Sequence, residues 1–359
     1  MKRRVSISIV LGLTLTAIDW GTASNWQPNA TLAVEVSTNT CNNPVGRLIS
    51  VQGAVQLKRR GRSDYHSTAV GTELCLGDVV RAAKGARAIV QCSDPNQNPW
   101  TVPEGVPSGV ANGCREPNKP RFRVPGPITP SRDRLGRSIP YIISPNSTLL
   151  LNDKPKLRWQ PVPGATSYIV RVSGPKVTWE TEVSTTEVVY PGEPPLQPVE
   201  QGYLLTVEAD NGESPARATF GLLDENQAQG VRTAGERIAS QNLPEDAKAL
   251  ALADLYVGQK LIAEALEVLE ASVAKGSQIA AIYHTLGDLY GQMELLSQAE
   301  KHYLKAFELA TTADNIEGQA DAAARLGEVY AALGNLEEAS RWQKEAQERY
   351  QALGVSLNP

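Results

Sequence analysis

The 359-residue sequence is poor in the side chains and motifs that most often carry catalysis or bind metals. It holds three histidines and four cysteines, and no two cysteines form a C-x-x-C pair. A G-x-S-x-G nucleophile turn, a glycine-rich phosphate loop and an H-E-x-x-H metal motif are all absent. These absences predict a protein that is not an enzyme and that binds neither a metal nor a cofactor.

Long apolar runs are equally scarce, and the one that is present lies at the N-terminus. After Lys2-Arg3-Arg4, residues 5–18 form an apolar-biased run of fourteen residues, which is shorter than the roughly 20 residues needed to span a bilayer. The charged start, the short run and the small residues after it predict a cleavable signal peptide within residues 1–33, ending after Ala23 or Ala33. We therefore expect a periplasmic or extracellular protein with no membrane span after cleavage. A retained membrane anchor is the alternative.

The few cysteines are clustered. Cys41, Cys75, Cys92 and Cys114 lie within 74 residues, and the 245 residues after Cys114 contain none. An even, clustered set in an exported chain predicts two disulfides, and the isolated position of His66 argues against zinc. Of the three pairings, we expect Cys41 with Cys75 and Cys92 with Cys114, because the second pair brackets a proline-rich loop.

Charge divides the chain into a basic part and an acidic part. From Asp224 onward there are 21 acidic and 11 basic residues, a net charge of −10, so the preceding residues carry +6 of the total of −4. The basic part includes an arginine- and proline-rich stretch at residues 117–143, and dense proline predicts an extended linker there. Because exported proteins rarely meet nucleic acid, we expect these arginines to face solvent or an anionic envelope polymer and predict no nucleic-acid partner.

Residues 41–116 are predicted to form a small β domain, in which glycines break short runs of strand-forming residues. Strict alternation would place Leu48 and Ser50 on one side of the first strand and Ile49 on the other. In the next strand, Val55 and Leu57 would share the buried side.

The same region resembles the FecR-like domain, a periplasmic β module. The resemblance rests on nine positions: Gly46, Gly53, Val55, Gly71, Leu74, Gly77, Asp78, Val80 and Arg81. It implies an envelope protein whose β module binds a glycan or a signalling protein. Asp78 stands between a glycine and a strand, so we expect it to cap that turn through an Asx-type hydrogen bond.

Residues 144–222 are predicted to form a second β domain. Trp159 precedes a Pro-Val-Pro-Gly turn, and Tyr168, Val170 and Val172 alternate in the following strand. The segment L-x-W-x-P-V-P-G-A-T-x-Y-x-V resembles a fibronectin type III or immunoglobulin-like sandwich. That resemblance implies that Trp159 is a core residue.

The last predicted domain, residues 224–359, contains an internal repeat spaced first by 34 and then by 40 residues. A leucine, a tyrosine four residues later and an alanine nine residues after that recur as Leu252, Leu286, Leu326, Tyr256, Tyr290, Tyr330, Ala265, Ala299 and Ala339. This pattern resembles the tetratricopeptide repeat, in which small residues let antiparallel helices approach closely. It implies an array of helix pairs. We also expect a capping helix at residues 225–239 and a longer turn near 311–319 that holds the six extra residues.

Arrays of this family bind peptides or partner proteins in the groove lined by the first helix of each pair. The residue two positions after each repeat leucine is acidic in all three units: Asp254, Asp288 and Glu328. A solvated face of an acidic domain would give the same pattern. We predict that these carboxylates form a partner-binding groove for a basic protein or peptide segment.

The predicted fold class is therefore multidomain, with two small all-β domains followed by an all-α tetratricopeptide-type array. The predicted function is that of a non-catalytic envelope scaffold that binds a protein partner through the array. The alternative is an envelope sensor or cell-wall-associated module, in which the FecR-like domain holds a glycan or a signalling protein and the helices only oligomerise. The two hypotheses differ in which half of the chain holds the ligand.

Overall fold

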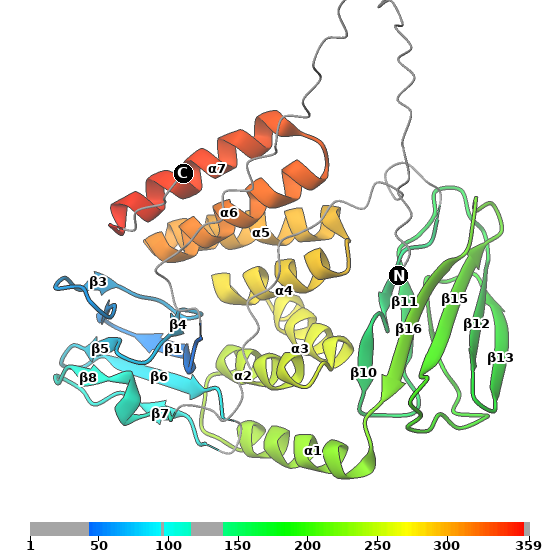
Figure 1. The fold of residues 1–359 in the computed structure, drawn as a ribbon, viewed down its shortest axis with the longest axis horizontal. Helices are drawn as coiled ribbons and strands as arrows, with labels where there is room; N and C mark the ends of the chain where they lie inside the picture. Colours follow the sequence, from blue (N-terminus) through cyan, green and yellow to red (C-terminus); the bar gives the residue numbers. More distant parts are fainter. Residues whose placement is uncertain (1–42, 95–96, 116–138, 355–359) are drawn as a thin grey trace, which may run out of the picture. The chain divides into compact units, whose positions relative to one another are not determined.

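The structure, a computed structural model, describes residues 43–94, 97–115 and 139–354. The predicted signal peptide, Cys41 and most of the predicted linker lie outside these residues. The described chain contains sixteen strands in four small sheets, followed by seven α-helices (Figure 1). This order confirms the predicted fold class, a β-rich N-terminal region followed by an all-α array. None of the described helices is long and apolar enough to cross a membrane.

The first β module, residues 43–115, consists of two four-stranded sheets with the orders β4-β1-β6-β7 and β3-β2-β5-β8. Apolar side chains such as Leu48, Val80 and Val90 fill the core between them. The strands are β1 (Gly46–Gln52), β2 (Val55–Lys58), β3 (His66–Ser67), β4 (Glu73–Leu74), β5 (Val79–Ala82), β6 (Arg87–Cys92), β7 (Trp100–Thr101) and β8 (Ser108–Gly109).

The predicted alternation holds in β2 but is wrong in β1. Val55 and Leu57 are both buried on the same side of β2, as expected. In β1 the pairing with β6 shifts register between Leu48 and Ser50, and Leu48, Ile49 and Ser50 are all buried. A β-bulge inserts one unpaired residue and turns the rest of the strand to the other face, which a strict period of two cannot describe.

Asp78 ties two loops of this module together. Its side chain accepts hydrogen bonds from the backbone N–H of Cys75 at 3.0 Å, from the backbone N–H of Arg60 at 3.0 Å and from Arg59 Nη1 at 2.8 Å. The predicted turn-capping role is present. However, the turn N–H that it caps comes from three residues earlier in the chain, whereas an Asx turn would use a residue that follows.

A disulfide joins Cys92, at the end of β6, to Cys114, which agrees with the second predicted pair. Cys75 is also disulfide-bonded. Closing a loop over the 22-residue separation of Cys92 and Cys114 restricts the unfolded chain by about 3 kcal/mol in the entropic account. The covalent link adds to the stability that the module gains from its apolar core.

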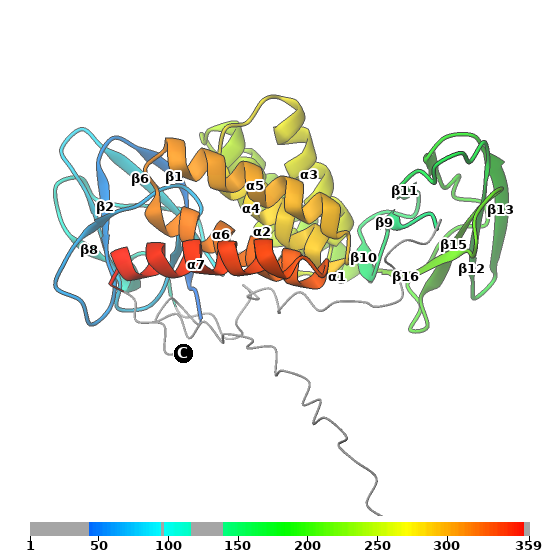
Figure 2. The same ribbon diagram turned by 90° about the horizontal axis from the view of Figure 1, so that it is seen from above.

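The second β module, residues 139–223, is built from a five-stranded sheet of order β10-β16-β15-β12-β13 and a three-stranded sheet of order β14-β11-β9. Figure 2 shows β12, β13, β15 and β16 of the larger sheet together, with β9 and β11 of the smaller sheet to one side of them. The strands are β9 (Ile142–Ser144), β10 (Thr148–Leu150), β11 (Lys156–Trp159), β12 (Tyr168–Gly174), β13 (Val177–Val183), β14 (Glu187–Val189), β15 (Tyr203–Ala209) and β16 (Ala216–Leu222).

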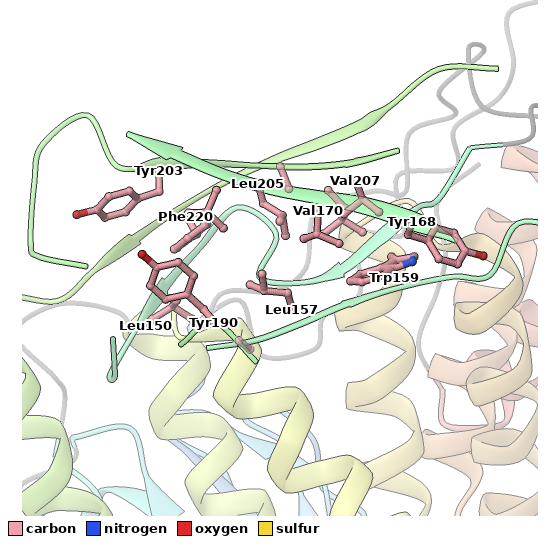
Figure 3. Close-up of a cluster of buried hydrophobic side chains, with 14 of the residues drawn as sticks. Leu150, Leu157, Trp159, Tyr168, Val170, Tyr190, Tyr203, Leu205, Val207 and Phe220 are labelled. Carbon is pink, nitrogen blue, oxygen red and sulfur yellow. The ribbon is translucent and has the colours of Figure 1, made fainter. Parts of the chain in front are cut away.

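Trp159 lies in the core of this module, as predicted. Its side chain meets the edge of Tyr168 with ring centroids 5.5 Å apart. Together with Leu157 it faces Val170 and Val207 of the opposite sheet (Figure 3). A buried indole and its edge-to-face neighbour supply a large apolar area in a fixed geometry.

The helices form one N-terminal helix and three antiparallel pairs. The first helix, α1 (Glu225–Ala239), has the bounds predicted for the capping helix and begins at Asp224, which accepts a hydrogen bond from Gln227 N. The pairs are α2 (Glu245–Gly258) with α3 (Ile262–Ala274), α4 (Ala280–Gln292) with α5 (Leu296–Thr312), and α6 (Ile316–Ala332) with α7 (Leu336–Ala352) (Figure 1).

The repeat alanines mark the contact lines between paired helices. Ala265 and Ala299 are fully buried and Ala339 is 4 % exposed. Leu286 and Leu326 are also fully buried, whereas Leu252 of the less regular first unit is only partly buried. Small residues at the contact let the two backbones approach, as predicted from the spacing.

The predicted long turn near residues 311–319 is wrong, because the six extra residues extend the helices. Helix α5 runs thirteen residues past Ala299, whereas α3 runs nine past Ala265. Helix α6 begins ten residues before Leu326, whereas α4 begins six before Leu286. The connecting loop shortens from five residues to three. Each of the two helices thus gains about one turn.

The turns inside the three helix pairs share one left-handed residue. Lys260, Glu294 and Gly334 occupy the same place in successive turns, with φ of 62°, 59° and 80°. A residue with a Cβ adopts this conformation at a cost, and glycine does not. The third turn is therefore the least strained of the three.

The second β module is joined to the array by hydrogen bonds, one of them between two backbones, and by an apolar contact. Thr148 Oγ1 accepts a hydrogen bond from the N–H of Ile262, the first residue of α3, at 2.8 Å. Leu149 N donates to Lys260 O at 2.9 Å, and Leu151 N donates to Glu264 at 2.7 Å. Ala263 belongs to the hydrophobic cluster of this module. A threonine from the sheet thus caps a helix that has no side-chain cap of its own.

Replacing Gly334 by alanine should lower the free energy of unfolding by about 1 kcal/mol, because the left-handed turn penalises a Cβ. No atom lies within 4 Å of the added Cβ, so the loss is purely conformational. Gly230, in the middle of α1 and equally open, is the matched control, and Gly230→Ala should raise stability by about 0.5–1 kcal/mol. Urea unfolding of both variants measures the difference. Equal effects of the same sign would contradict this account of the turn.

Candidate functional site

The three predicted groove acids lie at the same place in successive repeats, on the first helix of each pair. Asp254 is on α2, Asp288 on α4 and Glu328 on α6. Their side chains are 8 %, 14 % and 37 % exposed, respectively. Each carboxylate has a cationic partner within the chain. The structure brings Asp288 and Glu328 together on one arginine, and it pairs Asp254 with a different one.

Asp254 is paired with an arginine of the first β module. Arg47 Nη1 donates to Asp254 Oδ1 at 2.7 Å, and Arg47 Nη2 donates to Glu73 of its own module at 3.1 Å. Burial raises the pKa of Asp254 to about 6, although Arg47 opposes the rise. The carboxylate has therefore lost much of its hydration at this contact.

Asp288 is the centre of a hydrogen-bonded cluster inside the array. Its Oδ1 accepts a hydrogen bond from the Tyr303 hydroxyl at 2.7 Å and lies 3.5 Å from Arg325 Nε, while its Oδ2 lies 3.3 Å from His284 Nδ1. Burial favours the neutral acid, but His284 and Arg325 outweigh it and lower the pKa of Asp288. Arg325 Nη1 also donates to Glu328 at 2.9 Å. One arginine thus holds two of the predicted carboxylates.

Two further carboxylates continue the row on α6. Glu317 is paired with Arg59 of the first β module, and Asp321 accepts a hydrogen bond from the Tyr350 hydroxyl at 2.7 Å. Neighbours along the row act on shared groups, since Asp288 and Asp321 both raise the pKa of His284 and Asp321 raises that of Glu317. We call this row the acidic face; it comprises Asp254, Asp288, Glu317, Asp321 and Glu328.

Sequence reasoning missed Glu317 and the two arginines of the first β module that pair with the acidic face, Arg47 and Arg59. Glu317 falls among the six extra residues that were assigned to a turn, whereas it lies in the added first turn of α6. Extending the helix by its own periodicity would have placed Glu317 one helical turn before Asp321. Arg59 lies in a basic polar segment just after β2. Nothing in the local sequence indicates that Arg47 or Arg59 contacts the array.

The acidic face has the composition of a binding surface for guanidinium groups. Arginine presents a planar fork of donors that matches a carboxylate, and such charge-assisted hydrogen bonds are stronger than neutral ones. Among residues 43–94, 97–115 and 139–354, no group of three or more histidine, cysteine or acidic side chains could hold a metal ion. What the face offers chemically is recognition of cations by several carboxylates in a row.

One comparison with known proteins, the match to a family model, supports the assignment of the repeats. A family model described as a tetratricopeptide repeat matches residues 278–352, which include α4 to α7. Two crystal structures of MamA align with 36 % of this chain at 20 % identity, covering 70 % and 82 % of their own chains with TM-scores of 0.29 and 0.28. A crystal structure of BtubC (BKLC) from P. vanneervenii aligns with 37 % of this chain and 76 % of its own at 20 % identity, with a TM-score of 0.23. Curated protein sequences give no match.

The two histidines of the second helix pair should titrate in opposite directions from the ordinary value. Burial alone would lower the pKa of His284, but Asp288 raises it above the usual 6.5, whereas burial lowers that of His302 to about 4. His284 therefore adds stability that is complete below pH 6.5 and is lost as the pH rises through its folded pKa. Asp288→Asn should lower the pKa of His284 and leave His302 unchanged. An NMR titration of the imidazole protons measures both, and an unmoved His284 would contradict the pairing with Asp288.

Proposed function

We propose that this chain is a non-catalytic scaffold that binds a basic segment of a protein partner on the acidic face of its helical array. The match of residues 278–352 to the tetratricopeptide repeat supports a protein-interaction role. One observation carries the choice of partner. Two arginines from elsewhere in the chain, Arg47 and Arg59, already place their guanidinium groups on Asp254 and Glu317.

Asp254, Asp288 and Glu328 are proposed to contribute to this binding in different ways. Asp254 contacts an incoming cation directly. Glu328 is the most exposed of the three and attracts the partner from solution. Asp288 is held by Tyr303, so its contribution is a buried negative charge that strengthens the potential of the whole row.

We also propose that the protein works in the cell envelope or outside the cell. The Cys92–Cys114 disulfide supports an oxidising compartment. The glycine turns and the buried Asp78 support a FecR-like assignment of the first β module, and Trp159 in the core supports an immunoglobulin or fibronectin III-like assignment of the second. The alternative ligand is an envelope glycan held by the first module. Among the described residues, no pair of contacts comparable to those of Arg47 and Arg59 supports it.

Neutralising the acidic face should slow the binding of a cationic probe. We expect Asp254→Asn/Asp288→Asn/Glu328→Gln to lower the association rate constant of a tetra-arginine peptide about tenfold in low salt, since unlike charges steer association. The amide at position 288 keeps an acceptor for Tyr303, and circular dichroism checks that the fold tolerates the loss of both carboxylate partners of Arg325. The effect should shrink as salt rises, because the screening length falls to about 8 Å at physiological ionic strength.

The matched control neutralises three exposed acids elsewhere in the array, Glu308, Glu337 and Glu348, by substitution with glutamine. It changes the net charge by the same amount and should slow association less than the acidic-face variant, because these acids belong to α5 and α7 and not to the first helices that carry the acidic face. Stopped-flow fluorescence on the full chain measures both variants. Equal slowing in the two variants would show that net charge, and not the acidic face, attracts the probe.

A further inference from the structure

The first β module contacts every helix pair of the array. Arg47 reaches Asp254 on α2, Gly71 lies against Ala281 on α4, and Arg59 reaches Glu317 on α6. Arg62 Nη2 donates to Gly354 O, just after α7, at 2.9 Å. Two of these contacts are ion pairs with members of the acidic face. The module therefore lies on the surface that the proposed function assigns to a partner.

The two arginines are each shared between their own module and the array. Arg47 donates to Glu73 as well as to Asp254, and Arg59 donates to Asp78 as well as to Glu317. When the module leaves the array, each guanidinium keeps a carboxylate of its own module. Neither arginine is then left without a carboxylate. Undocking the module therefore costs less free energy than breaking most buried ion pairs.

On the array side, the ion pairs stabilise the ionised carboxylates of Asp254 and Glu317 little more than hydration would. Burial raises the pKa of Asp254 to about 6 and also raises that of Glu317. Removing a carboxylate from water costs free energy that its ion pair only partly recovers. A hydrated ligand with similar guanidinium groups can therefore compete for these positions.

Both β modules make ion pairs with the array, Arg158 with Glu270 in the case of the second module, but the two modules differ in their apolar contacts. The hydrophobic cluster of the second module includes Ala263 of α3. Among the described residues, the cluster of the first module contains only its own side chains. Ion pairs weaken with salt and exchange partners, whereas apolar burial and backbone hydrogen bonds hold a fixed interface. The first module has the weaker attachment.

We propose, building on the proposed function, that the first β module is a resident ligand of the acidic face and that the external partner is an arginine-bearing segment that displaces it. Arg47 and Arg59 occupy the positions that two guanidinium groups of the partner take over. The fraction of molecules that can bind the partner is then the fraction in which the first β module is undocked from the acidic face.

The test measures the affinity of the full chain for a tetra-arginine peptide by fluorescence anisotropy. Arg47→Ala/Arg59→Ala should bind the peptide about tenfold more tightly than the unsubstituted chain, the factor expected if about a tenth of the molecules are undocked. The control Arg81→Ala/Arg171→Ala removes the same charge from the β modules. Arg81 donates to Gln56, and Arg171 to Glu180 and Glu208, all within their own modules. The control should change the affinity less than about twofold.

A second variant leaves every charge in place. A Cβ at Gly71 would lie 2.2 Å from the Cβ of Ala281, so Ala281→Gln fills the space that the docked module needs. It should tighten peptide binding in the same direction as the double arginine variant. Circular dichroism checks that the variant folds. Arg47→Lys/Arg59→Lys keeps both positive charges but removes the two-donor guanidinium groups, and it should give an affinity between those of the unsubstituted chain and the double alanine variant.

The outcomes separate the two proposals. Tighter binding by the arginine and Ala281 variants, with an unchanged control, supports the resident ligand. Equal affinity of all these variants, together with weaker binding by Asp254→Asn/Asp288→Asn/Glu328→Gln, would overturn the resident ligand and leave the proposed function standing. Absence of peptide binding by every variant would overturn both.

Discussion

Each buried carboxylate of the acidic face must be matched by a cation or a hydrogen-bond donor, because an uncompensated buried charge costs several kcal/mol. Three arginines meet most of this requirement. Arg325 holds Asp288 and Glu328 from within the array, whereas Arg47 and Arg59 reach Asp254 and Glu317 from the first β module. The internal arginine pairs with two carboxylates of the row, and the two external ones are the observation on which the proposed recognition of guanidinium groups rests.

The modules differ in how firmly they are fixed to the array, and this difference follows from the chemistry of their contacts. Thr148 supplies the missing cap of α3, and Arg158 donates to Glu270 at 2.7 and 3.2 Å, so the second module completes the helix pair next to it. The first module contributes charges and one close backbone approach at Gly71. This difference is why we propose that the first module, and not the second, is displaced by a partner.

The repeats could be predicted from the sequence because their packing is local and periodic. The alanines that separate paired helices recur at fixed intervals, and so do the acids that follow each leucine, so one-dimensional spacing was sufficient to place α4 to α7 and the acids on them. The helix extensions around residue 317 were missed because an insertion was equated with a loop. The bulge at Ile49 was missed because it breaks the period of two that identified the strand.

The contacts between modules could not be predicted by the same reasoning. Arg47 and Asp254 are 207 residues apart in the chain, and neither has a neighbour in sequence that indicates its partner. The net charges of the two parts predict attraction between them but do not identify which groups meet. Ion pairs between separately folded units depend on three-dimensional complementarity, which composition and periodicity do not record.

The central claim is that Arg47 and Asp254 interact directly, and a double-mutant cycle tests it most directly. The free energies of unfolding of the unsubstituted chain, Arg47→Ala, Asp254→Ala and the double variant are measured by urea titration. We expect a coupling energy of about 1 kcal/mol, within the range found for residues in one ion-pair network and below the roughly 1.4 kcal/mol that a tenfold docking preference represents. Effects that add to within about 0.5 kcal/mol would show that the two side chains do not interact, and the first β module would then not be a ligand of the array.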